Sequence, residues 1–108
     1  MTEQRRSPRY GVELRGIVRS GSLADDRVII SNLSREGCRF SAPHRRIAGG
    51  TRLTIALGPV GILHARVAWR VGPVHGVSFD QPLHPAVLDH MRLFLSSEPA
   101  LIEERSAA

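Results

Sequence analysis

The chain has 108 residues, an ordinary apolar content of 42% and a formal net charge of +5. This length suits one domain with one core, and no apolar run approaches the roughly 20 residues that a membrane-spanning helix needs. All 15 basic residues are arginine. Arginine favours anionic partners because guanidinium pairs bidentately with phosphate and stacks on planar bases. A genome-wide preference for arginine over lysine explains the same count equally well.

The start of the chain and its single cysteine both favour the cytoplasm. Residues 1–6 are polar and lack the apolar stretch of a signal peptide. Cys38 permits neither an internal disulfide nor a cysteine-cluster metal site, and we expect it to be a small buried hydrophobe. The five histidines show no metal-ligand spacing. We therefore expect a cytoplasmic protein without a bound metal ion or cofactor.

An arm and six strands are predicted in chain order. Residues 1–10 are polar and arginine-rich and are typical of a flexible arm, in which Pro8 biases Ser7 towards extended backbone. Six alternating segments follow, most of them ended by glycine or proline: 12–19, 27–30, 38–41, 52–57, 62–71 and 74–79. No room remains for helical crossovers, so the pattern predicts an all-β fold, as a small antiparallel barrel or a sandwich.

One helix is predicted after the last strand, covering an open end or face of the barrel. Pro85 suits the first turn of a helix. Apolar residues recur at helical spacing: Val87, Leu88, Met91, Phe94 and Leu95. Pro99 ends this segment, and residues 98–108 are predicted to be a disordered tail. The single domain then spans residues 1–97, with the arm included.

Two short polar motifs carry the functional signal. Arg5 and Arg9 lie four residues apart in the arm, where both side chains can turn towards a ligand, although such pairs are common in an arginine-rich chain. The second motif is Asn32-x-Ser34-x-x-Gly37. Asn and Ser can bond backbone groups two residues on, and Gly permits a positive φ or a close backbone approach. An ordinary turn between strands explains this second motif equally well.

Together, the two motifs and the strands around them resemble the PilZ domain family of bacterial cyclic di-GMP receptors. Residues 5–9 match the RxxxR arm of that family, and residues 32–37 match its (D/N)xSxxG turn. The resemblance extends from Arg5 to about Leu95 and includes the segments 65–70 and 76–79. It implies a six-stranded antiparallel β-barrel with one C-terminal α-helix.

The resemblance also implies a set of cyclic di-GMP-binding residues: Arg5, Arg6, Arg9, Asn32, Ser34, Gly37 and Arg39. A guanidinium fork suits this role because it can hold a phosphate or the O6/N7 edge of guanine through two charge-assisted bonds. Asn32 is the neutral alternative to aspartate, and its amide offers one acceptor where a carboxylate offers two. For Arg39, a role as a solvated surface residue is an equal alternative.

The resemblance implies a non-enzymatic adaptor that changes the conformation of its arm and signals to an unidentified effector protein. The sequence contains no recognisable catalytic constellation. One alternative is a PilZ-like interaction module that does not bind the nucleotide. A third, weaker hypothesis is a small nucleic-acid-binding barrel, motivated by the positive charge. Such binders stack bases on aromatic side chains, whereas the few aromatic residues here, including Trp69, mostly fall at predicted core positions.

Overall fold

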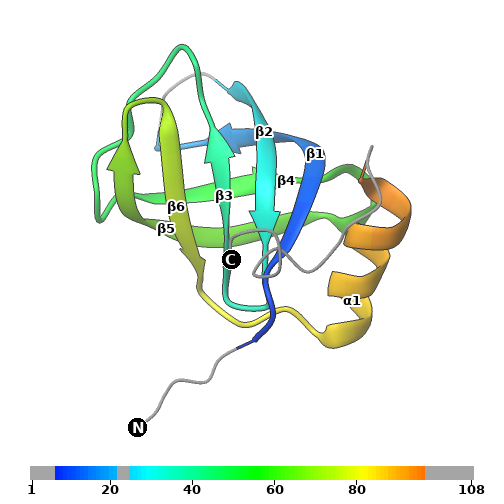
Figure 1. The fold of residues 1–108 in the computed structure, drawn as a ribbon. Helices are drawn as coiled ribbons and strands as arrows, with labels where there is room; N and C mark the ends of the chain where they lie inside the picture. The colour runs from blue at the N-terminus through cyan, green and yellow to red at the C-terminus, as the bar shows by residue number, and fades with distance from the viewer. Residues whose placement is uncertain (1–6, 22–24, 97–108) are drawn as a thin grey trace, which may run out of the picture.

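The computed structural model describes residues 7–21 and 25–96, which form six strands and a C-terminal helical segment (Figure 1). The strands are β1 (Tyr10–Arg19), β2 (Asp26–Leu33), β3 (Gly37–Ser41), β4 (Arg52–Ala56), β5 (Ile62–Val71) and β6 (Val74–Phe79). They form a closed antiparallel barrel in the order β1-β2-β3-β6-β5-β4, which the pairing of β1 with β4 completes. The predicted mainly-β fold is confirmed, and closure of the sheet decides for a barrel over a sandwich.

The core of the barrel follows from the alternation of side chains along the strands. On β1, for example, Val12, Leu14 and Val18 are buried while Arg15 and Arg19 are exposed. The largest fully buried apolar side chains come from most of the strands and from the helical segment: Phe40, Leu14, Ile30, Leu33, Ile55, Met91, Val18 and Val67. Burial of each larger apolar side chain contributes roughly 1.5–3 kcal/mol to the stability of the fold. The residues that alternation places inside the barrel therefore supply a large favourable term in folding.

The helical segment begins as an α-helix and ends as a wider turn. Helix α1 (Pro85–His90) continues into the π-helical turn η2 (Met91–Leu95), in which the Ser96 amide donates to the Met91 carbonyl at 3.1 Å. A π-turn spans five residues per hydrogen bond instead of four, so α-helical spacing no longer holds there. The prediction that Phe94 faces the core is therefore wrong, because its side chain is 73% exposed.

The helical segment lies against β1, as Figure 1 shows. The Arg92 guanidinium carbon lies 4.4 Å from the centre of the Tyr10 ring, and the Glu13 amide donates to Ser96 Oγ at 2.9 Å. The β1–β2 register shifts between Gly11 and Leu14, which leaves the Glu13 amide available for that contact. Among the described residues, no helix is long and apolar enough to cross a membrane.

One buried polar side chain, His75 on β6, closes the loop between β3 and β4. Its Nε2 accepts from the Ile47 amide at 3.0 Å, so the ring proton lies on Nδ1, 2.9 Å from the Pro73 carbonyl oxygen. The ring stacks on Phe40 with 5.1 Å between centroids. Burial lowers the pKa of His75, because the charged ring would lose solvation and Nε2 could no longer accept.

His75 should make the protein less stable in mild acid. Because its pKa is lower in the folded state, the unfolded chain binds more protons below the ordinary value of about 6.5, and the free energy of unfolding falls as the pH drops from there. His75→Phe should flatten this dependence while costing about 1–3 kcal/mol through the unsatisfied Ile47 amide. Denaturant unfolding at pH 5 to 8 checks both effects, and equal slopes for the two proteins would contradict the assignment.

Candidate functional site

The register of the barrel brings the second motif beside residues that lie far along the sequence. Asn32 on β2 pairs with Arg39 on β3, Arg39 pairs with Gly76 on β6, and Gly76 pairs with Trp69 on β5. A single row therefore crosses four strands. The pairing of β1 with β2 also places Gly11, just beyond the arm, opposite Asn32.

The arm touches the second motif through Arg9. Its Nε donates to Asn32 Oδ1 at 3.2 Å, and because arginine can only donate, the amide oxygen must face it. The Asn32 side chain is buried, at 1% exposure, and its Nδ2 has no partner among the described residues. Arg9 thus uses one of its five N–H donors to hold the arm against the barrel and keeps its terminal amino groups for other contacts.

The Asn32–Gly37 motif forms a tight turn between β2 and β3. The Ser34 amide donates to the Gly37 carbonyl at 2.9 Å, and the Glu36 amide donates to Ser34 Oγ at 3.2 Å. Two further bonds hold the turn to the segment after β6, one from Arg35 Nε to the Leu83 carbonyl at 2.8 Å and one from the Leu83 amide to the Arg35 carbonyl. These hydrogen bonds therefore fix the backbone of the turn.

Gly37 is required by a close approach of two strands. A Cβ atom at this position would overlap the carbonyl oxygen of Val77 on β6, and no positive φ is involved. The sequence left open whether glycine is needed here for a positive φ or for a close backbone approach. The structure shows that the close approach is the reason.

These residues surround a cavity of about 180 Å³. Its lining includes Arg9 from the arm, Ser34 and Gly37 from the turn, Arg39 from β3, and Trp69 from β5. The volume is below the roughly 300 Å³ of pockets that enclose a whole ligand, so it suits one planar base with the remainder of a ligand lying outside. Arg5 and Arg6 lie outside the described residues, and Asn32 lies beneath Arg9.

Trp69 is a site residue that the sequence analysis missed. It was expected in the core on the face of Leu63 and Val67, but a register shift between Val67 and Trp69 turns it outward, and it is 42% exposed. The indole lies over Gly76, where any Cβ would collide with it. The sequence signal for this outward position is Gly76, which pairs with Trp69. A residue without a side chain leaves room for an aromatic ring to lie over it on the surface of the sheet.

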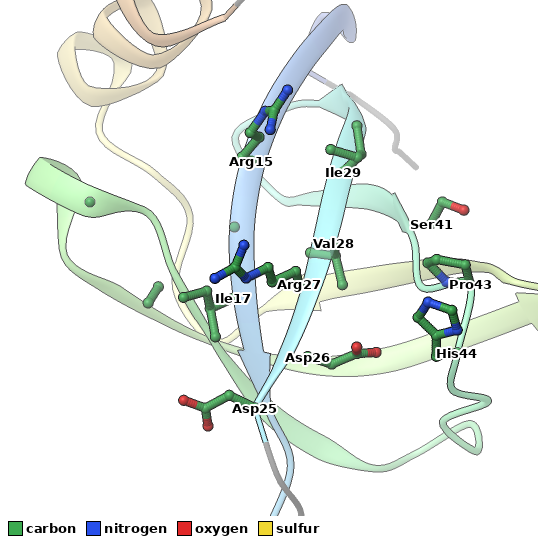
Figure 2. Close-up of a pocket in the computed structure, with 13 residues that line it drawn as sticks. Arg15, Ile17, Asp25, Asp26, Arg27, Val28, Ile29, Ser41, Pro43 and His44 are labelled. Carbon is green, nitrogen blue, oxygen red and sulfur yellow. The ribbon is translucent and has the colours of Figure 1, made fainter.

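A larger cavity of about 720 Å³ lies on another part of the surface (Figure 2). It covers the outer face of β1 and β2, where Arg15 pairs with Ile29 and Ile17 pairs with Arg27. It shares no lining residue with the smaller cavity and includes no residue of either motif. The larger cavity is therefore separate from both motifs.

Cys38 borders the smaller cavity but offers no nucleophile. It is buried and reduced, and burial raises the pKa of its thiol to about 12, so thiolate is scarce at neutral pH. Within residues 7–21 and 25–96, no group of three or more His, Cys, Asp or Glu side chains is placed to hold a metal ion.

Comparison with known families agrees with this geometry. The model of the PilZ domain matches residues 3–97, which include the arm, the turn and all six strands. No curated protein matches the chain. PilZ domains are receptor and adaptor modules associated with cyclic di-GMP, and the residues around the smaller cavity include Arg9 from the first motif and Ser34 and Gly37 from the second. Because the match covers most of its length, the chain belongs to the PilZ domain family.

Proposed function

We propose that this protein is a cytoplasmic receptor for cyclic di-GMP, which closes its N-terminal arm over the ligand and signals to an effector protein without acting as an enzyme. The observation that supports this most strongly is the meeting of both motifs at one cavity, through the bond from Arg9 to Asn32 and the lining by Arg9 and Ser34. Residues 1–97 would act as one domain in this role.

The proposed contacts follow from the chemistry of each side chain. Arg9 and Arg39, with Arg5 and Arg6 from the arm, would bind the phosphates and the O6/N7 edge of guanine, to which guanidinium makes paired bonds. Trp69 would stack on a base through its exposed indole. Asn32, Ser34 and Gly37 would form the barrel side, and Asn32, buried beneath Arg9, would contact the ligand through its unpartnered Nδ2 only after Arg9 moves aside.

Closure of the arm would provide the signal. Fixing the backbone of each arm residue costs roughly 1–2 kcal/mol. The bonds from Arg9 to Asn32 and from Ser7 to Glu36 offset part of that cost in the empty protein, and the phosphate contacts of the ligand would offset the remainder. An effector that recognises the closed arm would therefore bind the liganded protein in preference to the empty one.

Calorimetric titration of the purified protein tests the proposal. Cyclic di-GMP should give saturable binding, whereas GTP, cyclic GMP and cyclic di-AMP should bind weakly or not at all. Arg9→Ala and Ser34→Ala should both weaken the interaction. If cyclic di-GMP gave neither heat nor any shift in thermal stability at high concentration, the receptor function would be rejected in favour of an interaction module that does not use the nucleotide.

Trp69 should contribute a stacking platform worth about 1–3 kcal/mol. Trp69→Ala is therefore expected to weaken cyclic di-GMP binding at least fivefold, while Trp69→Phe, which keeps an aromatic face, should lose less. Because this is the only tryptophan, titration of its fluorescence in the unmodified protein should show quenching by the ligand. Unchanged affinity in Trp69→Ala would remove Trp69 from the site.

A further inference from the structure

Glu36 places a carboxylate at the edge of a cavity that otherwise suits an anion. It lies in the β2–β3 turn and lines the cavity together with Arg9, Ser34 and Trp69, and it is the only acid among the described lining residues. A site for phosphate alone would gain nothing from a negative charge, because like charges repel at short range. We therefore expect the carboxylate to face a part of the ligand that is neutral or rich in hydrogen-bond donors.

The two motif side chains beside Glu36 that could also accept are already engaged. Asn32 Oδ1 accepts from Arg9, and Ser34 Oγ accepts from the Glu36 amide while lying 3.4 Å from the Gly37 carbonyl oxygen. Guanine, however, presents two adjacent donors, N1–H and N2–H, on one edge. A carboxylate can accept both at once with one oxygen for each donor, whereas a hydroxyl or an amide offers a single acceptor atom.

We propose that Glu36 is the specificity-determining residue that accepts from the N1–H and N2–H groups of a guanine stacked beside Trp69. This inference rests on the proposed function and extends it to a residue at a variable position of the turn motif. It also explains why a neutral residue suffices at position 32. Glu36, four residues later in the same turn, supplies the two acceptor oxygens that an aspartate at position 32 would offer.

The same carboxylate couples base recognition to the arm. In the described structure Ser7 Oγ donates to Glu36 Oε2 at 2.7 Å, two residues before Arg9. A guanine that takes both carboxylate oxygens displaces the Ser7 hydroxyl and breaks this contact. Glu36 thus binds Ser7 in the empty protein and the base in the liganded protein, so Ser7 has to leave the carboxylate as the remainder of the arm closes over the ligand.

Paired titrations of the full chain with cyclic di-GMP and its inosine analogue, which lacks N2–H, test the proposal. A bidentate contact discriminates by roughly five- to hundredfold, so the unmodified protein should prefer the guanine ligand. Glu36→Gln should weaken cyclic di-GMP binding by about tenfold and bring the two affinities close together. Asp89→Asn, which removes the same charge from helix α1, is the matched control and should leave both affinities unchanged.

Ser7→Ala supplies a result of opposite sign, because loss of the competing hydroxyl should strengthen cyclic di-GMP binding. If Glu36→Gln bound the guanine ligand as tightly as the unmodified protein, or more tightly, the carboxylate would only repel the ligand and the inference would be overturned. An unmodified protein that did not bind cyclic di-GMP at all would instead reject the proposed function itself, and with it the inference.

Discussion

Gly37→Ala should lower the free energy of unfolding by about 3 kcal/mol, the upper range for added bulk in a well-packed region. The new Cβ would overlap the carbonyl oxygen of Val77, which is a backbone atom of β6 and cannot rotate away as a side chain can. Relief requires β3 and β6 to separate, and their pairing from Gly37 to Ser41 supports the cavity. The variant should therefore lose stability and ligand binding together.

Gly11→Ala is the matched control for this prediction. Gly11 also lies in a strand that borders the site, but a Cβ there meets no atom within 4 Å and its φ is not positive. Alanine in such a position should leave stability unchanged or raise it by roughly 0.5–1 kcal/mol. Chemical denaturation of the three proteins measures the difference, and equal stability of Gly37→Ala and Gly11→Ala would contradict the close approach.

The fold was predictable because its information is local. Alternation identified all six strands, and the buried residues of β1 and β4 follow it, since a period of two leaves only one way to bury a face. The helix was found, but its π-helical end was not, so Phe94 was placed on the wrong side. Departures from ideal geometry depend on tertiary packing and leave little trace in the pattern.

Residues of the candidate site were selected from the sequence only where a motif marked them. Spacing and the family resemblance selected Arg9, Asn32, Ser34 and Gly37, and the structure brings these together. Trp69 was missed because the register shift on β5 reverses the face that simple alternation assigns to it. Glu36, the residue proposed above, occupies an unspecified position of the motif, and it lines one cavity with Trp69 only because β6 pairs with both β3 and β5.

Arg9→Ala should weaken cyclic di-GMP binding more than any other single change among the described residues. Removal of one partner from a close charged pair costs about 2–5 kcal/mol, which corresponds to a loss of thirtyfold or more. Arg9 also joins the arm to Asn32, so its removal abolishes the only described hydrogen bond from the arm to the buried amide. Arg9→Lys keeps the charge without the planar fork and should recover only part of the loss.

Arg15→Ala separates this specific effect from a general loss of positive charge. Arg15 lies on the outer face of β1, at the larger cavity, and has no ion-pair partner within the described part of the chain. Both variants lower the net charge by one, so a purely electrostatic attraction of the dianion would weaken about equally in the two. Calorimetry at low and at physiological salt should instead show a large loss for Arg9→Ala and almost none for Arg15→Ala. Equal losses would mean that the protein attracts cyclic di-GMP through its overall charge, without the arm as a clamp.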